Sequence, residues 1–519
     1  MIAKTGLGSI VFLVTIVAAI DATAATFNVS DFGAAGDKQS KDTAAIQAAI
    51  DRCAEAGGGV VLVPAGDYLC GALRLASRVT LYLDAGATIW SSREPGDYED
   101  VGRCLLNGEG LQDVAVVGFG TLYGIGEADL GRKPESSGKD QWPDFRAGIL
   151  RLEECRNIEL RSFKILMSDT WTVHFRHCDN VLVDGLTILN NYYHTNSDGI
   201  DPVSCRNVRI SNCHIVAGDD CIVLKTADGR ACENVVVTNC TLETVATALK
   251  LGTESSGDFR NVHFSNCSIR NSTVGIGMYL KDGATMERIS FSNIDVETPR
   301  PSGITNLEKS VYPVFVDVER RNPDSKIGTI RDLSFDHLQI TSGVGVLIQG
   351  MPESPIENLS FTNVAFRVEA PADYGERKKH VGGRRTTRDE RDTLFVRKPS
   401  YVTLAHVDGL VVENLRLQAS PEDFRRQERS ALAVFESTAG VIRNVFRQQP
   451  GSADSPPVIL LENCRNMLVG GSVASPGTAS VVGLAGEKTA GIAIDKLGMH
   501  AAAAAVTLSE DVPAAALEE

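Results

Sequence analysis

The sequence has too little positive charge for a protein that binds nucleic acid over a broad surface. Its 519 residues include 51 Lys and Arg against 66 Asp and Glu, a net charge of −15 with a pI near 5.2. Nucleic-acid-binding domains usually show a basic excess, so we expect no nucleic acid as a partner. The acidic balance does not constrain a small ligand, because a local basic groove can lie in an acidic protein.

Motifs that mark metal and nucleotide sites are also missing. No Cys/His pair has the spacing of a zinc site. The glycine run Gly57-Gly58-Gly59 follows a predicted helix and precedes a predicted strand, which is the wrong order for a phosphate-binding loop. We therefore expect no metal and no cofactor.

The N-terminal apolar run, Ile10 to Ala19, is too short to span a membrane comfortably. Lys4 precedes it and the small residues Ala22-Thr23-Ala24 follow it, the order of a secretory signal peptide. We predict a signal peptide over residues 1–24 and an exported protein, periplasmic or secreted, without membrane insertion. A membrane anchor is the alternative.

The twelve cysteines are compatible with an oxidising compartment. However, Cys213, Cys240, Cys267 and Cys464 each follow an Asn at the same place in a repeated phrase. Because free Cys behaves as a small buried apolar residue, we predict stacked interior positions rather than a disulfide network. The sequence does not show whether any disulfides form.

A repeat of 27 residues dominates the middle of the chain. Similar phrases recur at Asn180, Asn207, Asn234, Asn261 and Arg288, each with alternating apolar residues around a turn. Several short strands per repeat, without helical periodicity or leucine-rich spacing, predict an all-β fold, a right-handed parallel β-helix. We predict one such domain over residues 25–494.

Other segments differ from the repeat. A helical pattern starting at Asp42-Thr43 predicts a short cap over the N-terminal end of the stack. Residues 124–143, 299–325 and 371–398 are predicted inserted loops, and the Ala-rich tail 495–519 is predicted to be disordered or a frayed helix. The basic segment 371–398 is either a solvated loop or a lid that attracts an acidic polymer.

Three acids precede two successive strands. Asp198 stands before Gly199-Ile200-Asp201, and Asp219-Asp220 stand before Cys221-Ile222. We align Asp198 with Asp220 on adjacent coils, where close carboxylates favour one protonated acid and one ionised base. An inverting glycosidase needs about 6.5–9.5 Å between its carboxyl groups, and adjacent coils with a lateral offset supply that spacing. Turn capping is the structural alternative for each single Asp.

The period also predicts side-chain columns on one outward face. Val223, Lys250 and Gly277 form one column, and Lys225, Gly252 and Tyr279 form another. With Lys281, these residues predict a polar groove beside the acids. The alternative is that Lys225, Lys250 and Lys281 are ordinary solvated lysines.

Two phrases around the acids resemble glycoside hydrolase family 28, the polygalacturonases and their relatives. Asn196-Ser197-Asp198-Gly199 and Gly218-Asp219-Asp220-Cys221 match the family's Asn-Thr-Asp-Gly and Asp-Asp-Cys motifs. The resemblance implies that Asp219 protonates the leaving oxygen and that Asp198 and Asp220 position and deprotonate water. It extends over the N-terminal phrase, Trp171 and the coils to about Phe366.

The sequence departs from the family at two motifs. Ala246-Thr247-Ala248 stands where the family has His between glycines, and Tyr279-Leu280-Lys281 stands where it has Arg-Ile-Lys. Losing the Arg fork weakens the case for plain polygalacturonate, although lysines can still hold a carboxylate as point charges. For Trp171, packing at a coil edge is favoured over sugar binding, and for His194 a structural role is favoured over orienting Asp198 or a substrate hydroxyl. The predicted substrate-binding residues are Asn196, Lys225, Lys250, Tyr279, Lys281, His194 and Trp171.

These observations predict an exported glycoside hydrolase that cleaves an acidic polysaccharide or oligosaccharide of the pectic kind by inversion. We expect a monomer. A β-helix polysaccharide lyase, with Ca²⁺ on the acids and a Lys base, is the first alternative. A lyase gives unsaturated uronate products and loses activity in chelator, whereas a hydrolase gives only new reducing ends. The second alternative is a non-catalytic carbohydrate-binding β-helix.

Overall fold

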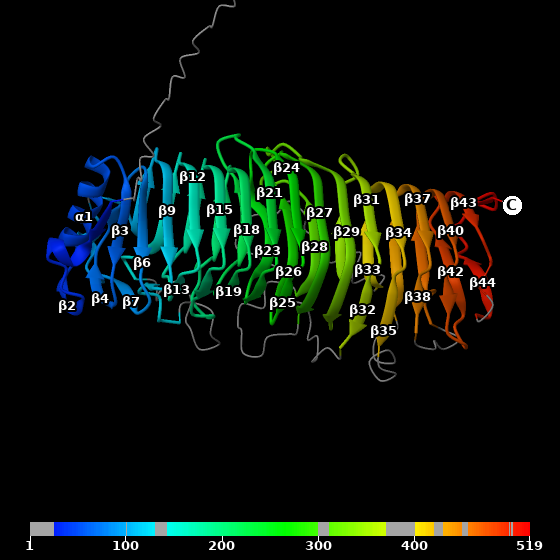
Figure 1. Ribbon diagram of the computed structural model, residues 1–519. Helices are drawn as coiled ribbons and strands as arrows, with labels where there is room; N and C mark the ends of the chain where they lie inside the picture. The colour runs from blue at the N-terminus through cyan, green and yellow to red at the C-terminus, as the bar shows by residue number, and fades with distance from the viewer. Residues whose placement is uncertain are drawn as a thin grey trace, which may run out of the picture.

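The computed structural model describes residues 25–99, 101–129, 143–298, 311–369, 400–419, 429–448, 455–497, 499 and 502–518. These residues form an elongated stack of short parallel strands, wound as a parallel β-helix (Figure 1). The predicted fold class is confirmed. The predicted signal peptide, most of the loop 124–143 and all of 371–398 lie outside the described residues.

The strands form two sheets. Sheet B has 15 strands, and its described strand pairs are parallel. Sheet A has 30 strands and supplies the other walls of the coils. The strands of sheet B are β5 (Leu73–Arg74), β8 (Cys104–Glu109), β11 (Gly148–Glu153), β14 (Val173–Arg176), β17 (Ile200–Val203), β20 (Ile222–Thr226), β23 (Thr247–Ser255), β26 (Val274–Leu280), β28 (Tyr312–Val318), β30 (Val346–Gln349), β33 (Ser400–Ala405), β36 (Ser430–Phe435), β39 (Ile459–Glu462), β42 (Ser480–Ala485) and β44 (Ala504–Leu508).

Sheet A runs from the first described strand to the last. Its first half comprises β1 (Thr26–Asn28), β2 (Asp37–Lys41), β3 (Gly59–Val63), β4 (Gly66–Cys70), β6 (Val79–Leu83), β7 (Ala87–Ser91), β9 (Gln112–Gly118), β10 (Thr121–Tyr123), β12 (Arg156–Arg161), β13 (Lys164–Leu166), β15 (Asp179–Asp184), β16 (Thr187–Leu189), β18 (Arg206–Ser211), β19 (His214–Ala217) and β21 (Cys232–Thr238). Its second half comprises β22 (Thr241–Thr244), β24 (Phe259–Ser265), β25 (Ser268–Arg270), β27 (Thr285–Thr298), β29 (Thr329–Ser342), β31 (Ile356–Thr362), β32 (Ala365–Val368), β34 (Val407–Glu413), β35 (Arg416–Ala419), β37 (Thr438–Arg443), β38 (Phe446–Arg447), β40 (Arg465–Gly470), β41 (Val473–Ala474), β43 (Ala490–Ile494) and β45 (Leu517–Glu518).

The predicted helical cap is confirmed as α1 (Thr43–Glu55). It lies at the N-terminal end of the stack (Figure 1) and buries Ile46, Ala49, Ile50 and Cys53 against the first coils. An open β-helix exposes apolar side chains at its end, so a helix with one apolar face covers that end. Two short 3₁₀ turns, η1 (Val29–Phe32) and η2 (Pro95–Tyr98), are the other described helical segments.

The interior is built from identical positions of successive coils. Phe264 and Phe291 stack with ring centroids 4.8 Å apart, and Phe291 and Phe335 with centroids 5.1 Å apart. All three rings are fully buried. Offset-stacked aromatic pairs add stability beyond their burial, so this column ties three coils together.

The Asn of the repeated phrase has a structural role. Asn207, Asn234 and Asn261 adopt left-handed backbone conformations with φ between 54° and 57°. Their side chains form a ladder along the stack, in which the Nδ2 groups of Asn234 and Asn261 donate to the Oδ1 of the Asn one coil earlier, at 3.1 and 2.9 Å. Asn tolerates this conformation better than other non-glycine residues, which explains why the repeat retains it.

All twelve cysteines are free and buried in the structure. Cys213, Cys240 and Cys267 occupy equivalent positions, and each thiol contacts the carbonyl two residues earlier at 3.2 to 3.3 Å. The prediction of stacked interior cysteines is therefore confirmed.

Two predicted boundaries differ from the structure. The segment 299–325 contains strand β28, which pairs with β26, because Tyr312 to Val318 continue the alternation of Val274 to Leu280 in register. The Ala-rich tail contains β44 and β45, so the coils continue past residue 494. Pairing with β42 overrides the helical preference of alanine there. No helix among the described residues meets the length and hydropathy needed to cross a bilayer.

Candidate active site

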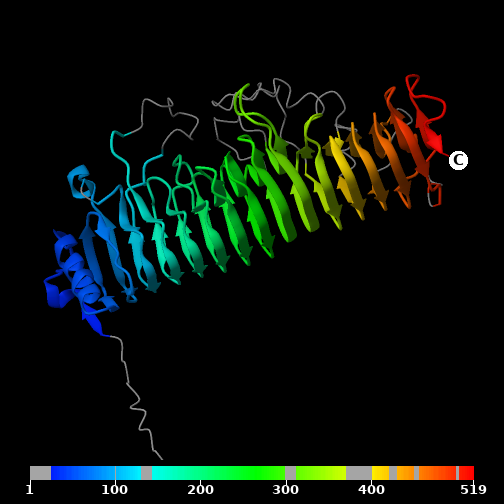
Figure 2. The same ribbon diagram turned by 90° about the horizontal axis from the view of Figure 1, so that it is seen from above.

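The three predicted acids lie where adjacent coils enter sheet B. Ile200 of β17 pairs with Ile222 of β20, and the Gly199 amide donates to the Asp220 carbonyl at 2.9 Å. This register aligns Asp198 with Asp220, as the sequence predicts. These coils lie in the green part of the stack (Figure 2).

The carboxylates of Asp198, Asp219 and Asp220 form one cluster. One oxygen from each lies within 4.8 Å of the other two. The exposed fractions of these residues are 3%, 8% and 2%, so Asp219 is the most accessible. Acids held this close cannot all ionise freely, which is the condition for acid/base work between them.

Asp220 is bonded through both carboxylate oxygens. Lys250 donates to its Oδ2 at 2.5 Å, and the Thr247 amide donates to its Oδ1 at 3.2 Å. Both contacts fix the orientation of this carboxyl group. Asp219 accepts the Asn196 amide at 3.2 Å, so Asn196 contacts the cluster through its backbone.

Lys225 joins the cluster to a fourth acid, Asp201. Its ammonium lies 2.5 Å from Asp201 Oδ1 and 3.4 Å from Asp198 Oδ2. It also lies 3.6 Å from the centroid of the Trp171 ring, a cation–π contact. Asp201 is not among the predicted site residues. Its neighbour Ile200 faces the interior, so strand alternation turns the Asp201 side chain outward, toward the acids. Asp198 Oδ1 is buried without a hydrogen-bond partner.

Burial and like charges shift the proton affinities of these groups. Burial, followed by Asp201, raises the pKa of Asp198 well above its ordinary value. Burial raises the pKa of Asp201 to about 6 against the opposing effect of Lys225. Burial disfavours the charge of Lys225, but Asp201 and Asp198 outweigh it and raise its pKa. Burial likewise opposes the charge of Lys250, and Asp220 outweighs it and raises the pKa.

His194 does not contact Asp198 in any described hydrogen bond. Its Nε2 lies 2.8 Å from Asp169 Oδ1 and its Nδ1 lies 2.5 Å from the Ala128 carbonyl. Arg146 contacts His194 Nε2 at 3.1 Å and donates to the Thr195 carbonyl at 2.7 Å. It is not among the predicted site residues. This buried network ties the segment before Asp198 to earlier coils. No local motif marks it, because its members come from three separate coils.

The remaining predicted residues follow the acids along sheet B. Lys281 forms an ion pair with Glu319. Tyr279 packs on Phe315 with ring centroids 5.1 Å apart and lies 5.5 Å from the Lys250 ammonium. The column Val223, Lys250, Gly277 is confirmed.

The second predicted column requires a correction. Between Leu224 and Thr226 the register shifts, and Thr226 pairs with Ser255, two residues beyond the strict period. The described pairings therefore do not place Lys225 in one column with Gly252 and Tyr279, and Tyr279 pairs with Asp317 of the next coil.

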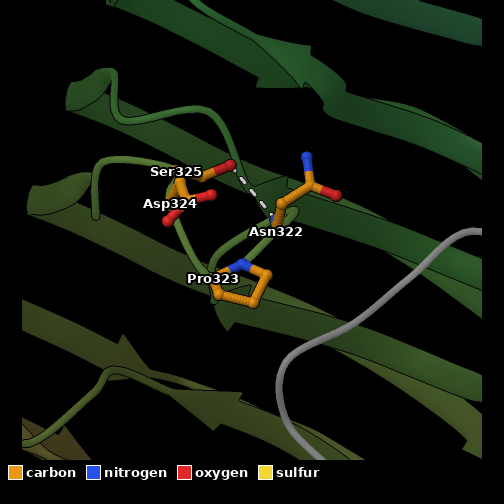
Figure 3. Close-up of a pocket in the computed structure, with 4 residues that line it drawn as sticks. All are labelled: Asn322, Pro323, Asp324 and Ser325. Carbon is orange, nitrogen blue, oxygen red and sulfur yellow. Dashed lines mark hydrogen bonds between the residues drawn. The ribbon is translucent and has the colours of Figure 1, made fainter.

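A cavity of about 450 Å³ lies on the connection after β28, not at the acid cluster. Its described lining is Asn322, Pro323, Asp324 and Ser325, and the Asn322 amide donates to the Ser325 hydroxyl at 3.1 Å (Figure 3). The cavity contains no carboxylate cluster with the geometry described above, so we place the candidate active site at the acids.

The fold and the site define a β-helix with a carboxylate cluster on its outer face, and comparison with known proteins gives the family. The family model described as glycosyl hydrolases family 28 matches residues 53–374. The chain belongs to this family.

Relatives in the family match over part of their length. A probable polygalacturonase of Vitis vinifera is 30% identical over 224 residues, covering 40% of this chain and 46% of the relative. An endo-polygalacturonase of Pectobacterium carotovorum is 27% identical over 217 residues, covering 36% of this chain and 52% of the relative. The chain thus spans about half the length of the curated relatives it matches.

Solved structures support the fold. An exopolygalacturonase of Thermotoga maritima has a TM-score of 0.54 at 20% identity, covering 76% of this chain and 92% of its own. An endo-xylogalacturonan hydrolase of Aspergillus tubingensis has a TM-score of 0.52 at 14% identity, covering 79% and 95%. At these identities the likeness concerns the fold alone.

Proposed function

We propose that this protein is a glycoside hydrolase that cleaves a pectic polysaccharide or oligosaccharide. The observation that carries the proposal is the cluster of Asp198, Asp219 and Asp220, whose oxygens lie within 4.8 Å of one another on the outer face of sheet B. Acid/base cleavage of a glycosidic bond needs paired carboxyl groups with different proton affinities. The family and the names of its polygalacturonase relatives support the substrate class.

The environments of the three acids support distinct roles in the proposed reaction. Asp219, the most exposed, donates its proton to the leaving glycosidic oxygen as the bond to the anomeric carbon breaks. Asp220, which accepts hydrogen bonds from Lys250 and the backbone amide of Thr247, takes a proton from the attacking water. Asp198 orients that water, whose oxygen forms the new bond to the anomeric carbon.

We propose inversion at the anomeric carbon on the family resemblance, not on the spacing of the acids. The nearest oxygens, within 4.8 Å, are closer than the separation of about 6.5–9.5 Å typical of inverting pairs. Proton NMR of the first product formed from a defined oligosaccharide distinguishes the outcomes. The proposal predicts the anomer opposite to that of the cleaved linkage, and retention would contradict it.

The contacts favour hydrolysis over lyase chemistry. A lyase needs a Lys available to abstract a proton α to a uronate carboxyl. Lys225 and Lys250, the two lysines at the cluster, each lie 2.5 Å from an aspartate that holds them protonated. Their raised pKa values make both poor bases at neutral pH.

The test of the function is digestion of defined pectic oligosaccharides by the purified protein and by Asp219→Asn. We expect new reducing ends from the wild type, no unsaturated product and activity that persists in chelator. Asp219→Asn should bind the oligosaccharide but not cleave it. An unsaturated product would contradict hydrolysis, and binding without cleavage by the wild type would support the non-catalytic alternative.

We also propose export, on the charge and small-residue pattern of residues 1–24 alone. N-terminal sequencing of the protein from the extracellular or periplasmic fraction should begin after Ala24. A mature protein that retains residues 1–24 would contradict this part of the proposal.

A further inference from the structure

The lysines beside the acid cluster already have carboxylate partners inside the protein. Lys250 pairs with Asp220 at 2.5 Å, and Lys225 pairs with Asp201 at 2.5 Å. Lys281, one coil further on, pairs with Glu319. The side chains of Lys225, Lys250 and Lys281 are 5%, 14% and 8% exposed. These cations therefore hold protein carboxylates and do not face solvent as a clamp.

Recruiting one of these lysines for a substrate carboxylate would break a buried ion pair. The abandoned aspartate or glutamate would remain buried and charged, and such a group is strongly destabilising. The arginine at the next coil is committed in the same way, since Arg321 contacts both oxygens of Asp282 at 2.6 and 2.8 Å.

The charges of the described site already balance. Four aspartates, at positions 198, 201, 219 and 220, face two lysines, Lys225 and Lys250. With one proton on Asp198 and one on Asp219, the proposed donor, two carboxylates face the two lysines. A uronate carboxylate placed between the acids and Tyr279 would add a third anion to this balanced set, at short range and low dielectric.

The outward face on the C-terminal side of the acids is apolar. Val274, Tyr312, Phe315 and Leu347 form a buried cluster there, and Tyr279 packs against it half-buried. The register puts this cluster next to the site, because Thr247 pairs with Val274 and Lys250 pairs with Gly277. Of the residues named here Tyr279 is the one that is partly exposed, and its ring suits the C–H face of a sugar better than an ionised carboxylate.

We propose that the sugar bound between the acid cluster and Tyr279 is uncharged. It is a neutral pyranose or a uronate whose carboxyl group is esterified, and both lack an anion at this position. The inference rests on the proposed function and specifies its substrate. It also accounts for the Tyr279-Leu280-Lys281 sequence, in which an aromatic ring stands where the family has an arginine fork.

The experiment compares two oligogalacturonides of equal length, one with free carboxylates and one fully methyl-esterified, with a third pectic oligosaccharide that alternates uronate and neutral sugar. Binding to Asp219→Asn is measured by calorimetry, and cleavage by the wild type as kcat/KM. The proposal predicts at least about tenfold tighter binding and faster cleavage of the esterified than of the free-acid oligomer. Asp219→Asn keeps this position uncharged, as the proton on the proposed donor does, so its binding comparison preserves the charge of the site.

Equal or tighter binding of the free-acid oligomer would overturn the proposal. Tight binding of the alternating oligosaccharide, with weak binding of both homopolymers, would support it and identify a neutral sugar instead of an ester as the source. Wild-type protein that binds the neutral oligomers without cleaving them would overturn the proposed hydrolysis and leave the neutral site intact.

A matched pair of variants sharpens the comparison at the aromatic wall. Tyr279→Arg should raise binding of the free-acid oligomer relative to the ester, because it restores a guanidinium at the position where the family carries one. Tyr279→Phe should keep the preference for the neutral oligomer. Unchanged preference in Tyr279→Arg would contradict the placement of the neutral sugar beside Tyr279.

Discussion

The inner and outer faces of the same coils follow different rules. Inside, equivalent positions repeat the same residue type, as Phe264, Phe291 and Phe335 do along three coils. Outside, on sheet B, successive coils carry unlike residues at one position, and Asp220 is followed by Thr247 and then by Val274. Repetition therefore marks where the stack is held together, and departure from repetition marks where chemistry is placed.

The two faces also differ in what their polar groups do. The Asn ladder uses neutral side chains that bond to copies of themselves one coil away. The outer face buries unlike charges, such as Lys225 with Asp201, in pairs that occur once. A neutral ladder adds stability at every coil, whereas a buried ion pair adds little and fixes an arrangement. Substitutions on each face should separate stability from activity.

The largest effect is expected at the acid cluster. Asp219→Asn should lower kcat/KM by about 10²–10⁴-fold, because it removes the proposed proton donor, while the melting temperature stays within error of the wild type. Asp51→Asn, at an exposed position of α1, is the matched control and should change neither kcat/KM nor the melting temperature. Full activity in Asp219→Asn, measured as release of reducing ends, would remove Asp219 from the reaction.

On the inner face, Phe291→Ala should destabilise the protein by about 3–5 kcal/mol, because it leaves a cavity between two stacked rings. The change is measured by denaturant unfolding. Below the melting transition, kcat on a pectic oligosaccharide should remain close to that of the wild type. A large loss of kcat in a folded Phe291→Ala protein would show that the two faces are not independent.

Lys225→Met should destabilise the protein by about 3–5 kcal/mol at neutral pH, because Asp198 and Asp201 lose their buried cation. Both carboxyl groups already have raised pKa values, with Asp201 at about 6. A raised acid binds its proton more tightly in the folded state, so the penalty should shrink as pH falls below about 6. A penalty independent of pH would contradict the ion pairing, and Lys225→Arg should retain most of the stability.

A smaller effect is expected in the ladder. Asn234→Ala should cost about 1–2 kcal/mol, since alanine pays for a left-handed backbone and the side-chain bonds to Asn207 and Asn261 are lost. Asn234→Gly should recover part of this loss, because glycine adopts the same φ without strain. Equal stability of the two variants would indicate that the side-chain bonds, and not the backbone conformation, set the cost.

The smallest change in stability is expected for Asp198→Asn. The pKa of Asp198 is raised in the folded protein. As pH rises above the ordinary value of 3.8, the unfolded chain loses this proton first, so the free energy of unfolding falls. Removing that charge should leave stability at neutral pH unchanged or higher by about 1 kcal/mol, while activity falls. A marked loss of stability would show that Asp198 supports the Lys225 site structurally.

The 27-residue period predicts the positions that are alike from coil to coil. It does not predict the positions at which successive coils differ. The cap α1, the buried cysteines and the alignment of Asp198 with Asp220 follow from local pattern and the period. The shift at Thr226 does not follow, because two extra residues on β23 break the column without a sequence signal. The pairing of each lysine with an acidic side chain is also not readable from the sequence, because it depends on which side chains meet across coils.

The central claim is that the acid cluster hydrolyses a glycosidic bond. It is tested most directly by digesting a defined pectic oligosaccharide in water enriched in heavy oxygen and analysing the fragments by mass spectrometry. The account predicts one heavy oxygen atom at each new reducing end, formed by the wild type and not by Asp219→Asn. Fragments that carry an unsaturated uronate and no heavy oxygen would contradict it.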